Sequence, residues 1–153
     1  MNEKMLNLTA TEELRAKHEK LWFDVILRML EENIRVNSTI GLSLIKSKFF
    51  IENDIDVPFN MCYLCEAYSC YECPLTLDGN ICTELYNHIC DYNFSQQIVI
   101  CIFIATCFLE LEGATTEQCR EYAFNRLREI GANKSAAMLR LKELESLLKE
   151  KGL

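Results

Sequence analysis

The spacing of apolar and polar residues predicts a chain built from helices. Between about residues 9 and 36, polar side chains recur every three or four positions, and the rest of the circumference is apolar. A polar stripe this narrow is typical of a helix that is buried on most sides. Its members are Lys17, Lys20, Asp24, Arg28, Glu31 and Arg35. Thr9 and Glu12 have the spacing of a capping box, so the helix is expected to begin beside Thr9.

Three later segments also predict helices. Residues 38–50 mix helical and strand spacing, and a second, shorter helix is the interpretation we favour. Residues 80–91 have helical spacing as well. Residues 95–112 form the most apolar stretch, whose β-branched content would also suit a buried strand. The length of this stretch and its flanking Ser95 and Gly113 favour a buried central helix that begins at Ser95.

The chain ends in two predicted helices. One covers residues 116–130 and stops at Gly131, and the other covers residues 134–149. Four apolar residues of the second helix form a narrow seam that suits pairing with one neighbouring helix: Ala137, Leu141, Leu144 and Leu148. We therefore expect an all-α fold, a bundle of five to six helices around the buried 95–112 helix. Residues 1–113 would form an acidic body, and residues 114–153 a helical hairpin packed on it.

Four cysteines near the middle of the chain have the spacing of a metal site. Cys62, Cys65, Cys70 and Cys73 form a Cys-x2-Cys-x4-Cys-x2-Cys cluster. Two residues between cysteines let both sulfurs turn toward one ion, and four thiolates complete the tetrahedral coordination of zinc. Because four protein ligands leave no position for water, the predicted role of Zn2+ is structural: it would hold the cysteine loop together and would not take part in catalysis.

The ligand set and the metal both have alternatives. Cys82 and Cys90 follow closely, and either of them could replace one of the first four cysteines, or several could build a second site. Thiols that hold no metal or are oxidised are a further alternative. His88, beside Cys90, is expected to be an exposed helix residue and not a ligand. An iron–sulfur cluster is the alternative cofactor, because Pro74 follows the last cysteine of the cluster as in bacterial ferredoxins, although the cysteine spacing differs.

The other cysteines and polar groups are expected to be structural. Cys101, Cys107 and Cys119 have apolar surroundings, where free cysteine behaves as a small hydrophobic residue. His18 is expected to be a partly buried or boundary residue and not a catalyst. Four carboxylates near the cysteines lack a spacing that would pair them for acid–base catalysis, so we interpret them as solvated surface: Glu66, Glu72, Asp78 and Glu84. The chain is therefore predicted not to be an enzyme.

Charge is distributed unevenly along the chain. The net charge is −7, with −9 on residues 1–113 and +2 on residues 114–153. No Lys or Arg occurs between Lys48 and Arg120, a stretch that contains all nine cysteines and eleven acidic residues. Because such a body lacks the basic side chains that hold phosphates, the distribution argues against nucleic-acid and anionic-membrane binding. It favours a protein partner with a basic surface and leaves the oligomeric state open.

Other features point to the cytosol. The first residues are polar and lack the apolar core of a signal peptide, and a reducing compartment would keep the thiols available for metal binding. The longest apolar run, Ile98–Leu109, has 12 residues, well short of the roughly 20 that cross a bilayer. We therefore expect a cytoplasmic protein without a membrane span.

Residues 61–90 resemble a set of small cysteine-rich phage and prophage proteins. The shared core is Cys-x2-Cys-Glu at Cys62–Glu66, then Cys-x2-Cys-Pro at Cys70–Pro74, and a further cysteine, Cys82. The Ala and Tyr that follow Glu66 are transposed relative to these proteins, and Trp22 matches their upstream helix. The resemblance extends over about residues 15–90. It implies metal ligation by the four clustered cysteines and Cys82, and a phage-type origin with the host cytosol as location, but no known activity.

A second resemblance concerns the C-terminal segment. Residues 127–145 resemble a helix-turn-helix with Gly131 at the turn, which would present Lys134, Arg140 and Lys142 to DNA. Two glutamates on the same helix favour a plain helical hairpin instead. Our leading hypothesis is a non-enzymatic, zinc-stabilised protein-binding module, with inhibition of a host or defence factor as its specific form. A DNA-binding regulator and an iron–sulfur or redox protein are the alternatives.

Overall fold

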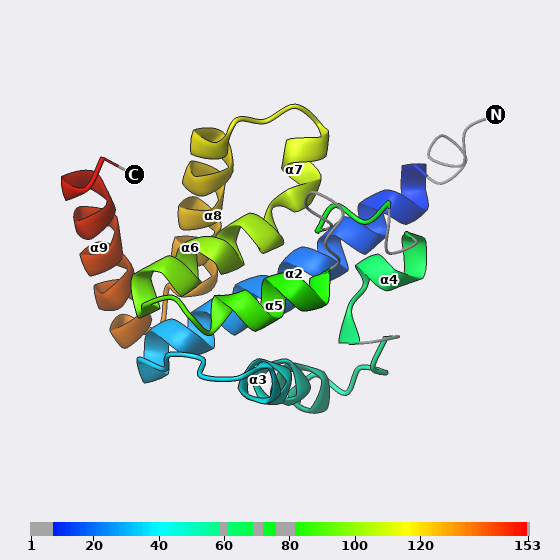
Figure 1. Cartoon of the computed structure of the whole chain (residues 1–153), viewed down its shortest axis with the longest axis horizontal. Helices are drawn as coiled ribbons and strands as arrows, with labels where there is room; N and C mark the ends of the chain where they lie inside the picture. Colours follow the sequence, from blue (N-terminus) through cyan, green and yellow to red (C-terminus); the bar gives the residue numbers. More distant parts are fainter. Residues whose placement is uncertain (1–7, 59–60, 69–71, 76–81, 153) are drawn as a thin grey trace.

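The computed structural model describes residues 8–58, 61–68, 72–75 and 82–152. These residues form eight helices and contain no strand, which confirms the predicted all-α class (Figure 1). The helices are α2 (Leu8–Glu32), α3 (Thr39–Glu52), α4 (Leu64–Ala67), α5 (Cys82–Ile89), α6 (Phe94–Ala105), α7 (Cys107–Leu111), α8 (Thr116–Ile130) and α9 (Ser135–Glu150).

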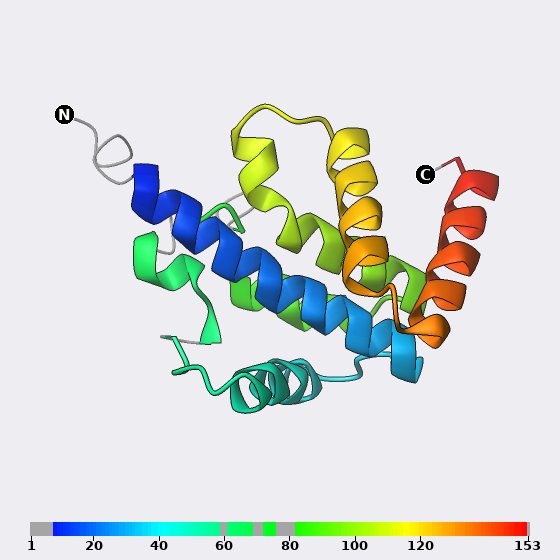
Figure 2. The same cartoon turned by 180° about the vertical axis from the view of Figure 1, so that it is seen from behind.

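Helix α2 is the element on which the other helices pack. It contacts α6 and α9 most extensively, and it also touches α3, α8 and α4 (Figures 1 and 2). The predicted centre of the bundle was the 95–112 helix, but α2, with 25 residues, reaches more of its neighbours. Its deeply buried side chains are Leu21, Trp22, Phe23, Val25, Ile26, Leu27, Met29 and Leu30. This burial agrees with the narrow polar stripe in its sequence.

The C-terminal end of α2 comes earlier than the apolar pattern suggested. The helix ends at Glu32 and not near Val36, because Asn33 adopts a left-handed backbone conformation with φ of 53°. Asparagine tolerates this conformation better than most residues. The N–H of Ile34 then donates to the carbonyl of Met29 at 3.1 Å, which satisfies a backbone group that the helix end leaves open.

The residues at the start of α2 and just after its end also differ from the prediction. The helix already includes Leu8, so Thr9 lies inside it and is not its cap. Arg35, expected on the polar stripe of the helix, follows the helix instead. Its guanidinium donates to the carbonyls of Tyr92 and Cys90, at 2.8 and 2.6 Å. It thereby satisfies backbone groups just after α5.

The ambiguous segment 38–50 is helical, as favoured. Ser38 caps α3 by accepting a hydrogen bond from the N–H of Gly41 at 3.1 Å. One face of α3 is buried against the body of the protein through Leu42, Ile45, Lys46, Phe49 and Phe50. The opposite face is exposed.

The most apolar stretch is also helical, but it begins at a different residue. Asn93, and not Ser95, is the N-cap of α6. Its side chain accepts from the N–H of Gln96 at 2.9 Å, and the Gln96 side chain accepts from the N–H of Asn93 at 3.1 Å. Asn-x-x-Gln therefore works as a capping box, although Ser and Thr are the more usual first residues.

The same stretch is divided into two helices at Thr106. The hydroxyl of Thr106 donates to the carbonyl of Ile102 at 2.8 Å, a back-bond that bends helices. The carbonyl of Ile104, next to the break, accepts a hydrogen bond from Nε2 of His18 at 2.7 Å. The break therefore leaves Ile104 with a partner from α2, and α7 continues in a new direction (Figure 1).

A buried glutamine connects α6 to two distant segments. Gln97 is fully buried, and its Oε1 accepts from the N–H of Val36 at 2.8 Å. Its Nε2 donates to the carbonyls of Val36 and Ile89, at 2.7 and 2.9 Å. These bonds hold the connection after α2 and the end of α5 beside the start of α6.

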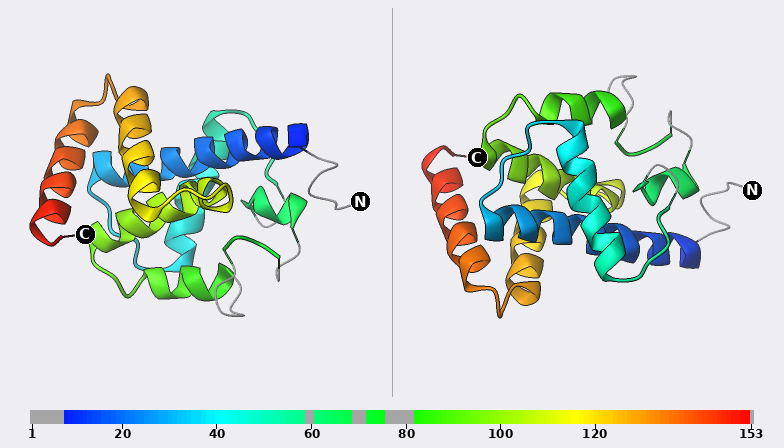
Figure 3. Two further views of the ribbon diagram at one scale, coloured as in Figure 1. Left: turned by 90° about the horizontal axis from the view of Figure 1, so that it is seen from above. Right: turned by 90° about the horizontal axis from the view of Figure 1, so that it is seen from below.

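The last two helices agree with the sequence pattern. α8 has the predicted bounds, begins with a capping box of Thr115 and Gln118, and ends at Gly131. The predicted apolar seam of α9 is buried: Ala137, Leu141, Leu144 and Leu148. α9 packs across the C-terminal end of α2, at the end of the molecule opposite to the start of α2 (Figure 3). Within the described residues, no helix has both the length and the apolar character that a membrane span requires.

Candidate functional site

The described part of the cysteine-bearing segment lies at the end of the molecule where α2 begins (Figures 1 and 2). Aromatic contacts anchor this segment to the core. The ring of Tyr63 packs edge-on against Phe50 of α3, with 6.2 Å between centroids, and the ring of Tyr68 lies 6.5 Å from Phe108 of α7. Leu64 is fully buried. The segment is therefore part of the packed structure, and not a loop that extends into solvent.

The structure brings a distant cysteine to this segment. Cys62 is buried, and Cys65 and Cys73 are half-buried. Cys107 of α7 is buried, as predicted, and burial raises the pKa of its thiol. The neighbouring sulfurs of Cys73 and Cys62 raise this pKa further, because like charges disfavour ionisation. Sequence spacing could not show that Cys107, from a different helix, joins them.

His18 lies next to Cys107 and is completely buried, whereas we expected a boundary position. Its Nε2 is 2.7 Å from the carbonyl of Ile104 and 3.6 Å from Sγ of Cys107. A carbonyl can only accept, so Nε2 carries the proton. Burial, opposed by the hydrogen bond to Ile104 and assisted by the charge of Lys46, lowers the pKa of His18 to about 4, so the ring is neutral at physiological pH. Its ring also packs against Phe108, with 5.5 Å between centroids.

The predicted metal ligands are only partly within the described residues. Among these residues, no group of three or more His, Cys, Asp or Glu side chains is arranged to hold a metal ion. Cys70 and the side chain of Cys82 lie outside them. The predicted ligand set of Cys62, Cys65, Cys70, Cys73 and Cys82 therefore stays a prediction. Sulfur donors of this kind would suit zinc, or the alternative iron–sulfur cluster, far better than magnesium or calcium.

The alternative ligands at the end of α5 are placed differently. Cys90 follows the last residue of α5, and its Sγ contacts the carbonyl of Tyr86 at 3.7 Å. An eight-residue helix is about 12 Å long, so Cys90 is separated from the position of Cys82 by the length of α5. His88 is exposed, as predicted, and its Nδ1 lies 3.7 Å from a carboxylate oxygen of Asp91.

Acidic side chains are exposed on and near the cysteine segment. Five exposed carboxylates belong to the segment after α3, to α4, to residues 72–75 and to α7: Asp54, Asp56, Glu66, Glu72 and Glu110. We call this set the acidic end. Glu66 and Glu72 are exposed, as predicted, whereas Asp78 and the side chain of Glu84 lie outside the described residues. Helices α8 and α9 each carry three basic and three acidic residues, so the basic excess of residues 114–153 comes from Lys134 and Lys151, which flank α9.

The basic residues proposed to read DNA are largely engaged within the protein. Nζ of Lys134 lies 3.0 Å from a carboxylate oxygen of Glu31 on α2. Arg140 pairs with Glu143 at 2.9 Å and covers the ring of Phe94 at 4.4 Å. These contacts fix α9 on the body of the protein and favour the hairpin interpretation over a recognition helix.

A buried cation was not singled out by the sequence pattern. Lys46 of α3 is almost completely buried, and its Nζ lies 5.3 Å from the ring centroid of Trp22 and 5.6 Å from that of Tyr86. The two rings stack on each other with 6.1 Å between centroids. Aromatic faces stabilise an ammonium in a desolvated position. The only sequence signal for this arrangement is that Lys46 lies three to four residues from Leu42, Phe49 and Phe50, on the apolar face of the helix.

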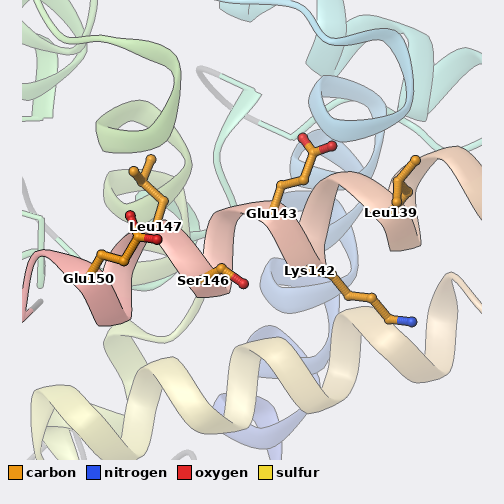
Figure 4. A pocket seen from close by; sticks show the side chains of 6 residues that line it. All are labelled: Leu139, Lys142, Glu143, Ser146, Leu147 and Glu150. Carbon is orange, nitrogen blue, oxygen red and sulfur yellow. The ribbon is translucent and has the colours of Figure 1, made fainter.

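One concavity of about 430 Å3 lies along α9 (Figure 4). It is lined by Leu139, Lys142, Glu143, Ser146, Leu147 and Glu150. Lys142 and Glu143 point to opposite sides of the helix (Figure 4). Catalysis requires groups held around one reacting atom, and this arrangement does not bring its charged groups together. No protein-family model matches the chain, nor does any curated protein or solved structure.

Proposed function

We propose that the protein is a non-enzymatic protein-binding module that presents its acidic end to a partner with a basic surface. The observation that carries this proposal is the set of exposed carboxylates on and near the cysteine segment, which belong to a stretch without Lys or Arg between Lys48 and Arg120. Complementary charge of this kind speeds association and selects partners, and it acts at short range in physiological salt.

A metal would serve this function by fixing the segment that carries the charge. Zinc held by Cys62, Cys65, Cys70 and Cys73, with Cys82 as an alternative ligand, would bind thiolates and release their protons. Ligation would restrain Glu66 and Glu72, which lie between or beside the ligands in the sequence. Fixed carboxylates lose less conformational entropy when a partner binds. The resemblance to small phage proteins makes a host or defence protein the class of partner that we expect, and inhibition the expected effect.

The experiment is affinity capture of a partner from host lysate, followed by binding measurements at low and high salt. The test variant is Glu66→Lys with Glu72→Lys, and the matched control is Lys142→Glu with Lys149→Glu on α9. All four side chains are exposed, so the fold should tolerate the changes. We expect the test variant to lose most of the binding and the control to keep it. Binding that depends only on the α9 residues would reject the proposal.

A further inference from the structure

The exposed face of α3 carries an apolar row. Ile40, Leu44 and Ile51 have relative exposures of 73, 59 and 77%. They occupy positions i, i+4 and i+11 of the helix, and the half-exposed Ser47 lies between them at i+7. Residues with this spacing lie on one side of a helix. We call these four residues the α3 stripe.

The stripe is unusual among the described residues. Eight large apolar side chains are exposed among all the described residues, and three of these eight belong to α3. A fourth, Val57, follows the helix with an exposure of 57%. The other four are distributed over separate elements: Tyr92, Leu111, Ile130 and Leu139. Single exposed apolar residues are ordinary, whereas an aligned row marks a surface for another protein.

The charges near the stripe define the partner further. Asp54 and Asp56 are exposed just beyond the C-terminal end of α3, and no Lys or Arg follows Lys48 until Arg120. The C-terminal end of a helix also carries partial negative charge. Lys48 is exposed at this end as well and Arg28 engages Glu52, so Asp54 and Asp56 leave this end of the stripe with a net negative charge. At the other end, Asn37, Ser38 and Thr39 are uncharged.

We propose that the α3 stripe is the docking site for an amphipathic helix of another protein, with Lys or Arg at the end that lies over Asp54 and Asp56. This inference rests on the proposed function and specifies the form of the partner. The stripe residues are spaced four, three and four positions apart. The apolar face of a partner helix has the same spacing, so the side chains of the two helices can interdigitate. From Ile40 to Ile51 the stripe is about 16 Å long, which matches about three helical turns of the partner.

The test uses a fluorescently labelled synthetic peptide that is helical, has leucines at 4-3-4 spacing and has lysines at one end. A second peptide differs only in having glutamates in place of these lysines. Anisotropy with the full chain should give a dissociation constant of about micromolar order for the lysine peptide, since the interface is small. The glutamate peptide should bind about tenfold more weakly.

Variants of the protein locate the binding site. Leu44→Gln with Ile51→Gln should weaken binding of the lysine peptide by about tenfold or more. The control is Leu139→Gln, which removes an equally exposed leucine from α9 and should change nothing. Asp54→Asn with Asp56→Asn should remove most of the preference for lysine over glutamate. Asn is chosen because Asp54 has a φ of 52°, a conformation that Asn also tolerates.

The outcomes separate this inference from the proposed function. Equal binding of the lysine peptide to the wild type and the Leu44/Ile51 variant would overturn the inference. A wild-type dimer that the same variant converts to a monomer would also overturn it, because a second copy would then cover the stripe. If the captured partner still binds the Leu44/Ile51 variant but not the Glu66/Glu72 variant, the inference fails and the proposed function stands. If the partner binds both variants, both fail.

Discussion

The side-chain amide of Gln97 pairs with both backbone groups of Val36, 61 residues earlier in the chain, at 2.8 and 2.7 Å. The Gln97 side chain thus satisfies both the N–H and the carbonyl of Val36, which lies outside the helices. Because Gln97 also donates to Ile89, three buried backbone groups depend on one side chain. Unsatisfied buried groups of this kind are among the most costly defects in a core.

Gln97→Leu should therefore destabilise the protein by at least about 3 kcal/mol, with about 1 kcal/mol or more for each abandoned group. The matched control is Gln96→Leu, which removes only an exposed capping bond and should cost about 1 kcal/mol or less. Denaturant unfolding monitored by tryptophan fluorescence is suitable, because Trp22 is the single tryptophan and is fully buried. Equal losses in the two variants would contradict the role assigned to Gln97.

Two glycines should respond to alanine in opposite directions. At Gly131 an added Cβ would lie 2.9 Å from the carbonyl of Leu127 and 3.4 Å from Leu27, so Gly131→Ala should cost about 1–3 kcal/mol. At Gly41, inside α3, the nearest atom would be 3.5 Å away, so Gly41→Ala should stabilise the protein by up to about 1 kcal/mol. Thermal denaturation of the two variants measures both effects. A stabilising Gly131→Ala would show that α8 and α2 do not approach as described.

Metal content tests the cysteine prediction. Purified protein should contain close to one zinc per chain, and a chelator should lower the melting temperature because ligation is linked to folding. Cys62→Ser or Cys73→Ser should reduce the zinc content strongly, whereas Cys101→Ala should leave it unchanged. Burial raises the pKa of Cys101 to about 12, which fits a core thiol that stays protonated. If the wild-type protein contains far less than one zinc per chain and all its thiols react, the predicted metal site is wrong.

The regular helices could be predicted from sequence because their signals are local. The bounds of α8 follow from Thr116 and Gly131, and the α9 seam follows from the spacing of its apolar residues. The end of α2 at Glu32 and the break at Thr106 were missed, because each depends on one residue's backbone or side-chain hydrogen bond within a continuing apolar pattern. Periodicity does not register such single bonds.

The site was less predictable, because its contacts come from different helices. The burial of His18 depends on α6 and α7, and the approach of Cys107 to Cys62 and Cys73 depends on how α7 turns after the break. Neither the burial of His18 nor the approach of Cys107 can be predicted from the sequence pattern of the helix that contains the residue. Charge was different, because the stretch without Lys or Arg can be read directly from the sequence, and the structure adds only that Asp54, Asp56, Glu66 and Glu72 are exposed.

The most direct test of the account is zero-length coupling of carboxylates to lysines in the complex with the captured partner, followed by mass spectrometry. Coupling joins only groups that are in contact, so it shows which carboxylates face the partner's basic residues. We predict cross-links from Asp54, Asp56, Glu66 and Glu72, which should weaken at high salt. Cross-links confined to carboxylates of α8 and α9, such as Glu121, Glu129 and Glu150, would contradict the claim that the acidic end binds the partner.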